Sequence, residues 1–450
     1  MNYMSKLWPA LTLVLLFAGY AGYYFCRTNL ALAKTELAAE FGDQGITEKT
    51  ITNIASTGLV FYAVGKLITG ATCDFVGGRI MFIGGMFGSV ACTFLFIAAP
   101  TLAAKIGAGS LFWLFLAAAC LNRFIQSTGW GALVKVTSNW ISFQNYGRVM
   151  GFLCVSYLFG DFAARQILPH FKEGGGWQQM FAVSGEILLV IAVICLIGLR
   201  SRPSDVGLSN PAVNPSNLHG KSGADERPPS IWELLQPYLF SPSYWLVLLM
   251  SMTLTFVRES SNFFNNDYLK VAAQVSQKQA DIYSSYFPLF GAIAVLATGF
   301  MTDKLYNGRR GLLMAGSLSL LLPVLWAMAF VASIEGTLWP VVLVCCVGFL
   351  SLAPYAFLTG AISLDLGGKR GSATAAGILD AVGYAVGGVL GLEIKSLIVP
   401  AGATTIVAWQ PFFTLMLGLI TITSVACVAY WFIQERQPRV TFEAEPAAAE

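Results

Sequence analysis

The sequence predicts an all-α membrane protein with twelve transmembrane helices in two pseudo-symmetric six-helix bundles. Composition, the spacing of apolar runs and an internal repeat all support this fold. Of the 450 residues, 56% are hydrophobic and 11% charged, and the mean hydropathy is +0.66. Such values lie outside the range of soluble globular proteins and are typical of polytopic membrane proteins.

Apolar runs of about 20 residues or more, the length needed to cross a bilayer, recur along the chain. We expect spans at 8–33, 50–73, 80–99, 108–136, 147–170, 179–200, 243–267, 281–301, 311–332, 338–363, 372–397 and 408–433. The first run is too long for a removed signal and lacks a small-residue cleavage site, so it is predicted to span the membrane.

The largest polar break, residues 201–230, divides six spans from six. It is rich in Pro, Ser, Asn and Gly and is predicted to bury nothing. The expected domains are a bundle at 1–200, a cytoplasmic linker at 201–240, a second bundle at 241–434 and a cytoplasmic tail at 435–450.

Basic residues in the loops predict the orientation. With both termini in the cytoplasm, Lys and Arg are about twice as frequent on the cytoplasmic side as on the opposite side. We therefore expect a multi-pass protein of the bacterial inner membrane with cytoplasmic N- and C-termini.

The two halves of the chain repeat each other. "GATCDFVGGR" (70–79) follows the second span and "GFMTDKLYNGRR" (299–310) follows the eighth, each with Gly-x-x-x-Asp, a later Gly and basic residues. Arginines within the first and seventh spans, Arg27 and Arg258, precede these loops by similar distances. Two homologous six-helix halves are typical of a parallel-repeat transporter.

Both arginines belong to polar stripes whose members lie three, four and seven residues apart and so share one side of a helix. The stripes are Tyr20, Tyr23, Tyr24 and Arg27 on the first helix, and Arg258, Ser261, Asn262 and Asn265 on the seventh. Such stripes must face protein or water, because lipid cannot satisfy them. A guanidinium donates two parallel hydrogen bonds and suits phosphate.

A plainer interpretation is that each arginine only pairs with a buried carboxylate. Glu259 follows Arg258 directly but points about 100° away around the helix, so we expect it not to be a direct partner. Lys66, one turn after Tyr62, either snorkels to the membrane surface or adds a point charge to a central cavity. Several apolar residues follow it, which favours the cavity.

Other charged residues have several possible roles. Asp161 and Arg165, four residues apart, are expected to form a local ion pair rather than a proton site. Asp380 pairs with Lys66, Arg123 or Arg258, or is protonated and acts as a coupling group. Cytoplasmic gate networks that do not touch substrate are expected from Asp74, Arg79, Asp303, Arg309 and Arg310.

The layout of two six-helix halves with paired Gly-x-x-x-Asp loops resembles the major facilitator superfamily and its fold. Within that superfamily, three segments resemble the organophosphate:phosphate antiporters, which exchange glycerol phosphate or hexose phosphate. They are "GYAGYYFCRTNLALA" in the first helix, "FYAVGKLITGATCD" in the second and "LTFVRESSNFFNNDYLK" in the seventh. The resemblance implies that two arginines grip phosphate on the pseudo-twofold axis. It also implies substrate contacts at Gln126, Trp130 and Tyr384.

The sequence departs from this family at several positions. "QSTGWGALVK" lacks the family's diproline, the fifth-helix histidine aligns on Tyr157, and the tenth-helix tyrosine has no match in "LSLAPYAF". Arg123 is an addition, similar to an arginine of proton-coupled facilitators. These departures leave the substrate class open.

The leading hypothesis is an antiporter that exchanges an organic phosphate for inorganic phosphate by alternating access. The substrate contacts are expected from Arg27, Arg258, Lys66, Tyr20, Tyr24, Tyr62, Gln126, Trp130, Asn262 and Tyr384. One alternative is a proton-coupled carrier of another organic anion or sugar, with Asp161, Glu259 or Asp380 as proton site. Another is a transporter-like sensor of sugar phosphate.

No motif supports an enzyme. The two histidines share no motif, and the nine cysteines lie almost entirely in apolar runs without metal-type spacing. We expect no cofactor, no metal and no nucleic-acid partner, and a monomer in the lipid bilayer.

Overall fold

The computed structural model describes residues 3–225, 227–304, 308–331, 335–390, 394, 398–399 and 405–436, and its regular secondary structure there is helical. The first half contains α1 (Tyr3–Leu32), α2 (Lys34–Phe41), α3 (Glu48–Val76), α4 (Gly78–Ile106), α5 (Leu111–Gln126), α6 (Thr128–Trp140), α7 (Tyr146–Ile167) and α8 (Lys172–Gly198). The second half contains α9 (Ile231–Leu239), α10 (Pro242–Ala272), α11 (Gln277–Ser284), α12 (Tyr286–Lys304), α13 (Gly311–Phe330), α14 (Trp339–Phe357), α15 (Ser363–Val382) and α17 (Gln410–Tyr430).

Each of the twelve predicted spans overlaps one of these helices or a pair of them, and residues 332, 391–393 and 395–397 of the predicted spans 311–332 and 372–397 lie outside the described residues. In the described part of the chain, nine segments are long and apolar enough to cross a membrane, or ten with the bent pair α9 and α10. One of the nine, Trp339–Gly387, overlaps two predicted spans, 338–363 and 372–397, and non-helical backbone at Gly368 (φ 58°) divides it between them. α7 adds a further helix of 22 residues.

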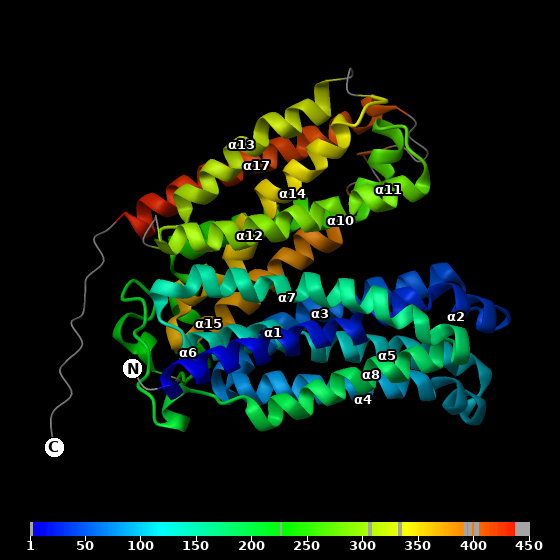
Figure 1. The fold of residues 1–450 in the computed structure, drawn as a ribbon, viewed down its shortest axis with the longest axis horizontal. Coiled ribbons are helices and arrows are strands. Elements are labelled where there is room, and N and C mark those ends of the chain that lie inside the picture. Colours follow the sequence, from blue (N-terminus) through cyan, green and yellow to red (C-terminus); the bar gives the residue numbers. More distant parts are fainter. Residues whose placement is uncertain are drawn as a thin grey trace.

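The two halves form two layers in Figure 1, with α1 to α8 below and α10, α12, α13, α14 and α17 above. α15 lies between them, against the first half. α1 begins and α17 ends at the left of this view, which we call the terminal face; α2 and α11 lie at the right, the distal face. The predicted domain boundaries stay predictions, and residues 437–450 of the predicted tail lie outside the described residues.

The two most extensive helix contacts between the halves are those of α3 with α15, the first seam, and of α7 with α12, the second seam. Both depend on glycine. A Cβ at Gly70 would lie 2.8 Å from the backbone oxygen of Ala373, and one at Gly299 would lie 2.6 Å from that of Gly147. No larger residue fits this close approach of two backbones. The glycines of the repeated Gly-x-x-x-Asp motif thus bring the halves together.

The aspartates of the same motif lie one turn further along. Asp74 Oδ2 accepts hydrogen bonds from the backbone N–H and the hydroxyl of Thr374, both 2.7 Å long. Asp303 accepts from the backbone N–H groups of Gly147 (3.0 Å) and Arg148 (2.8 Å), at the start of α7. A carboxylate is favourable at a helix start, where N–H groups lack helical partners. The halves are therefore closed against each other on the terminal side.

The linker is more ordered than predicted. Asn214 and Asn217 are buried, Asn214 Nδ2 donates to Asp365 Oδ1 (2.8 Å), and the Leu218 N–H donates to the Leu366 carbonyl (2.8 Å). At its other end, Asn139 of α6 donates to the Ser201 carbonyl (3.2 Å). The expectation that residues 201–230 bury nothing was wrong, because amide and backbone groups find hydrogen-bond partners on the halves. We call residues 201–225 the strap.

Candidate functional site

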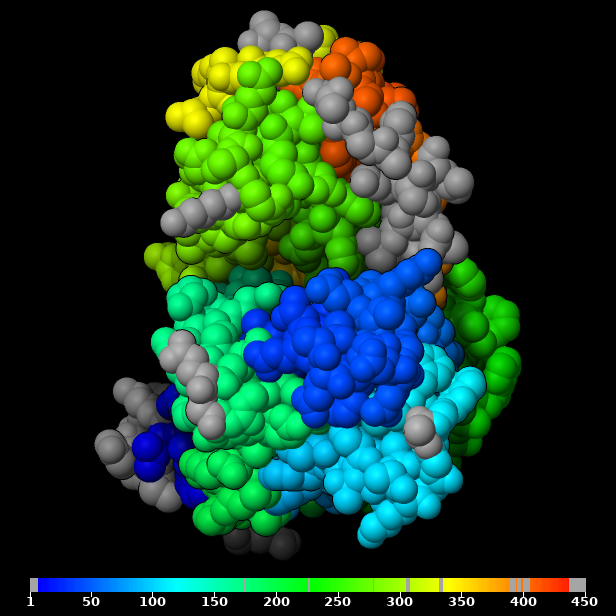
Figure 2. All heavy atoms as spheres, turned by 90° about the vertical axis from the view of Figure 1, so that its right-hand side faces the viewer, coloured from blue at the N-terminus to red at the C-terminus, as the bar shows by residue number. Residues whose placement is uncertain are grey.

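A central cavity lies between the two halves; the atom-free space among its lining residues is about 350 Å³, including the part that is open to solvent. Its lining comes from both halves: Tyr20, Tyr24, Tyr62, Lys66, Trp130, Cys154 and Tyr157 from the first, and Arg258, Tyr355, Ala356, Thr359, Asp380 and Tyr384 from the second. Figure 2 looks onto the distal face, where a hollow separates the green atoms of the second half from the blue atoms of the first.

Arg27 adjoins this cavity from α1 and is held by neutral groups. Its Nε donates to Gln126 Oε1 (3.0 Å) and one Nη to the Tyr62 hydroxyl (3.5 Å). Its guanidinium carbon lies 4.5 Å from the centre of the Tyr24 ring and 4.9 Å from that of Tyr62. Gln126 is fixed in turn by Ser89 Oγ (2.9 Å), so the guanidinium is oriented without a carboxylate among the described residues.

Arg258 lines the cavity from α10 in the second half. It donates to the hydroxyls of Tyr355 and Tyr384, and its Nε is buried without a hydrogen-bond partner in the described structure. It also pairs with Glu259, so the expectation that Glu259 is not a direct partner was wrong. The angle of about 100° between consecutive residues fixes only the direction in which each side chain leaves the helix. Arg258 has a long side chain, which reaches Glu259 in spite of this angle.

Lys66 and Asp380 meet across the interface of the halves. Lys66 Nζ of α3 lies 2.6 Å from Asp380 Oδ2 of α15, and both side chains are almost fully buried. The sequence left Lys66, Arg123 and Arg258 as possible partners of Asp380, and in the structure its partner is Lys66. The same ammonium lies 5.0 Å from the centre of the Tyr62 ring, so it belongs to the cavity and not to the membrane surface.

Aromatic side chains close the cavity between the halves. The rings of Tyr62 and Tyr384 meet edge to face with centroids 5.4 Å apart. Trp130 Nε1 donates to the carbonyl of Thr359 (2.9 Å). The centroid of the Trp130 ring lies 5.2 Å from that of the Tyr20 ring. These predicted residues are thus brought together, and two of the contacts cross from one half to the other.

The predicted coupling residues lie in different places. Arg123 donates to the Arg27 carbonyl (3.4 Å) behind the cavity. Asp161 accepts from Arg165 Nε (2.9 Å) and from Thr28 (3.0 Å), the local ion pair expected from their spacing. Both members of that pair are partly solvent-exposed.

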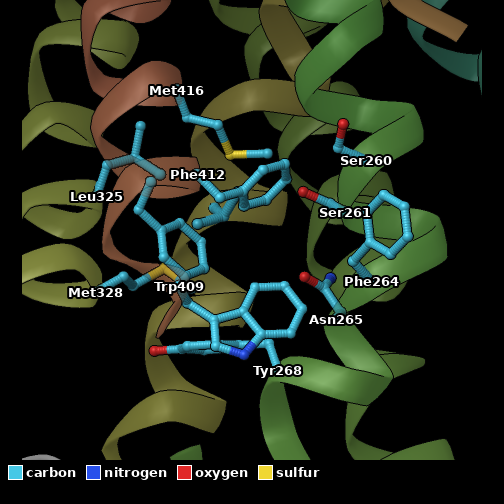
Figure 3. A pocket seen from close by; sticks show the side chains of 12 residues that line it. Ser260, Ser261, Phe264, Asn265, Tyr268, Leu325, Met328, Trp409, Phe412 and Met416 are labelled. Carbon is cyan, nitrogen blue, oxygen red and sulfur yellow. The ribbon is translucent and has the colours of Figure 1, made fainter. Parts of the chain in front are cut away.

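The stripe on α10 does not face the central cavity beyond Arg258. Asn262, predicted to bind substrate, is exposed and does not line it. Ser261 and Asn265 line a second cavity inside the second half, and Figure 3 shows them pointing from α10 towards Phe412 and Trp409. The helical spacing was right, but this face points into a cavity that is also lined by α13, α14 and α17 of its own half.

Sequence reasoning missed several lining residues. Tyr355 lies in "LSLAPYAF", where no match to the family's tyrosine was expected, yet its hydroxyl meets Arg258. Tyr157, noted only as the position of the family's histidine, lines the cavity with a buried hydroxyl that has no partner in the described structure. A polar aromatic residue inside an apolar span was the available signal for both.

Of the predicted gate residues, Asp74 and Asp303 cross between the halves. Arg79 instead binds the carbonyls of Leu196 (2.8 Å) and Leu199 (2.7 Å) at the end of α8, within its own half. Arg310 is buried and pairs with Asp365, also within one half, and Arg309 is exposed. None of the five lines the central cavity.

Charges in and beside the cavity do not balance. Four basic and two acidic side chains of the described chain lie there: Arg27, Lys66, Arg123, Arg258, Glu259 and Asp380. Two positive charges remain when all six are ionised. In a region shielded from water such an excess attracts an anion strongly.

Comparisons with known proteins agree with this architecture. The chain is 24% identical to a probable hexose phosphate transport protein of Chlamydia trachomatis (96% of this chain, 93% of the relative) and 24% identical to the membrane sensor protein UhpC of Salmonella typhimurium (98% and 95%). Its fold resembles that of the transporter FucP in the outward conformation, with a TM-score of 0.65 at 12% identity (93% of this chain, 99% of the other). A model of the Major Facilitator Superfamily matches residues 16–392. The chain therefore belongs to the Major Facilitator Superfamily, a family of multi-pass membrane transporters and not of enzymes.

Proposed function

We propose that the protein exchanges an organic phosphate, such as a sugar phosphate or glycerol phosphate, for inorganic phosphate across the membrane. The observation that carries this proposal is a pair of arginines from opposite halves: Arg258 lines the central cavity, and Arg27 lies directly behind two tyrosines that line it, with two excess positive charges in this region. A phosphate ester carries about −1.5 to −2 charges at pH 7 and matches that excess, and inorganic phosphate matches it in its dianionic form. The hexose phosphate relative supports a sugar phosphate as one substrate.

Exchange follows from the charges. In the empty carrier the first half contributes three positive charges at the cavity and the second half one net negative charge, so the two halves attract each other there. A bound dianion neutralises two of the positive charges and weakens this attraction, so the loaded carrier changes conformation more readily than the empty one. A ligand shifts a conformational equilibrium by its difference in affinity for the two states, which here makes transport depend on a substrate in each direction.

The experiment is uptake of radiolabelled phosphate into liposomes that contain the purified protein. The vesicles are preloaded with phosphate, with a sugar phosphate or with buffer alone, each with and without a proton gradient. We expect uptake only into vesicles that contain phosphate or a phosphate ester, with little response to the gradient. Gradient-driven uptake into buffer-loaded vesicles would instead identify a proton-coupled carrier.

A second candidate function is a sensor, which the similarity to the membrane sensor protein UhpC favours. A sensor would bind the sugar phosphate in detergent and show negligible flux in every liposome preparation. Proton coupling has less support, because Asp161, Glu259 and Asp380 each already pair with a basic side chain.

We further propose that the protein is a monomer in the bacterial inner membrane with its terminal face in the cytoplasm. Asp74 and Asp303 would then close the cytoplasmic side, and the structure would correspond to the outward-facing state. Labelling of a cysteine introduced at Lys105, at the distal face, by a membrane-impermeant maleimide added to intact cells tests this orientation. Labelling only after lysis would contradict it.

A further inference from the structure

The ion pair between Lys66 and Asp380 lies where the central cavity meets the first seam. Lys66 belongs to α3 and Asp380 to α15, and a Cβ at Gly377, one turn before Asp380, would lie 2.5 Å from the Lys66 carbonyl. The helices are therefore in backbone contact beside the pair. Tyr62 and Tyr384, each one helical turn from a member of this ion pair, line the cavity and their rings meet.

Opening the terminal face requires α3 and α15 to separate, because their glycine contacts and the hydrogen bonds from Thr374 to Asp74 hold that side closed. Separation also pulls Lys66 from Asp380. An unpaired charge left in a buried, water-poor site is strongly unfavourable, far more than the loss of an exposed pair. The empty carrier is thus held closed by this pair in addition to the seams.

We propose that Asp380 is a built-in counter-anion that occupies Lys66 in the empty carrier, and that the substrate's phosphate displaces it. This inference rests on the proposed function. Once Lys66 pairs with the phosphate, the first seam separates without leaving a bare ammonium in the cavity, and Asp380 is hydrated from the side that opens. The pair therefore couples opening of the terminal face to occupancy, and a carrier without Asp380 transports phosphate without an exchange partner.

The test compares Asp380→Asn with the wild type in two measurements: phosphate affinity in detergent, and phosphate uptake into liposomes loaded with buffer alone. Removing the competing carboxylate should tighten phosphate binding by at least about fivefold, a typical coupling between two ligands. Uptake into buffer-loaded vesicles, absent in the wild type, should appear. Asp380→Glu retains the carboxylate and should retain exchange.

A matched control removes another carboxylate from an ion pair. Asp267 pairs with Lys270 at an exposed site within α10, so Asp267→Asn should leave affinity and exchange unchanged. Unchanged affinity in Asp380→Asn, or uptake that still requires internal phosphate, would overturn the inference. Failure of the wild type to bind or exchange phosphate would instead reject the proposed function.

Asp380→Asn leaves Lys66 without its partner and so puts folding at risk. The double variant Lys66→Met with Asp380→Leu removes both charges and keeps the volume, and such replacements of buried ion pairs are often well tolerated. It should allow uptake into buffer-loaded vesicles without any gain in affinity. Strict exchange by a well-folded double variant would also overturn the inference.

Discussion

Arg27 is held in place by hydrogen bonds that a lysine cannot reproduce. Its Nε and Nη atoms reach two different groups, Gln126 and Tyr62, from one planar fork. We expect Arg27→Lys to keep the charge but lose directed hydrogen bonds to the phosphate, each worth about 1.5–3 kcal/mol. Phosphate affinity, measured by isothermal titration calorimetry, should fall roughly tenfold to hundredfold.

Arg258→Lys should act similarly, and the double variant should lose less affinity than the sum of the single losses, because both arginines bind one ligand. The melting temperature of each variant provides the control. Unaltered affinity with a lower melting temperature, or strictly additive losses, would remove Arg27 from the site.

The sequence predicted which residues lie at the central cavity better than it predicted the contacts that these residues make. Arg27, Lys66, Gln126 and Trp130 stand out because polar groups inside apolar spans need a reason to be there. The pairing of Arg258 with Glu259 could not be predicted, since it depends on how a long flexible side chain bends and not on helical angles. The role of Tyr355 depends on a contact between α10 and α14, which one sequence does not reveal.

At the level of helices, each seam combines a glycine contact with a carboxylate that accepts hydrogen bonds from the facing helix. Asp74→Asn keeps the size of the side chain but loses the charge that attracts Lys135 and strengthens the hydrogen bonds from Thr374. We expect the balance of the two conformations to shift by about 1–3 kcal/mol and turnover to slow, while phosphate binding in detergent survives. Exchange rates in liposomes, measured beside affinity, check this.

Asp303→Asn on the second seam is the matched variant and should behave alike, because Asp303 makes equivalent bonds to the start of α7. Glu48→Gln, which removes an exposed ion pair with Lys34, should change neither the exchange rate nor the phosphate affinity. A loss of binding as large as that of Arg27→Lys would show that Asp74 contacts the substrate.

The stability of the docked strap, residues 201–225, is expected to depend on pH. His219 meets the Tyr238 hydroxyl (3.0 Å), and burial, with Arg370 and Lys135 nearby, lowers its pKa to about 4. A released strap would titrate near the ordinary value of 6.5. The docked strap is therefore fully stable above about pH 6.5 and loses stability as the pH falls from there towards 4, because only the released form takes up the proton readily.

Hydrogen exchange at the Leu218 amide, which donates to Leu366, should report this release. After correction for intrinsic rates, exchange should be faster at pH 5 than at pH 8 in the wild type. In His219→Gln the corrected exchange rates at pH 5 and pH 8 should be the same. Equal protection of the wild type at both values would contradict the prediction.

Helices were predictable and the strap was not, for a physical reason. Apolar spans carry their own signal, because the bilayer requires about 20 apolar residues wherever the chain crosses. The strap is stabilised by hydrogen bonds to particular carbonyls and carboxylates, such as those from Asn214 to Asp365 and from Leu218 to Leu366. These partners are more than 140 residues away, so local composition suggested only a polar linker.

For the molecule as a whole, the charge balance at the cavity predicts how transport responds to voltage. If the two excess positive charges are matched by one dianion in each direction, a full exchange cycle moves no net charge. Exchange of phosphate for a phosphate ester at neutral pH should then be unaffected by a potassium diffusion potential set with valinomycin. A rate that changes with the potential would show that the two exchanged ions differ in charge.

The carboxylates of the two seams, Asp74 and Asp303, have a consequence for a cell whose surroundings change in salt concentration. Asp74 is fully buried and Asp303 nearly so, and each binds backbone N–H groups directly, so dissolved ions cannot reach or screen these contacts. Salt does reach an anion approaching the open cleft and weakens its attraction to the positive cavity. Osmotic stress should therefore slow the capture of substrate while leaving the resting preference for one conformation unchanged.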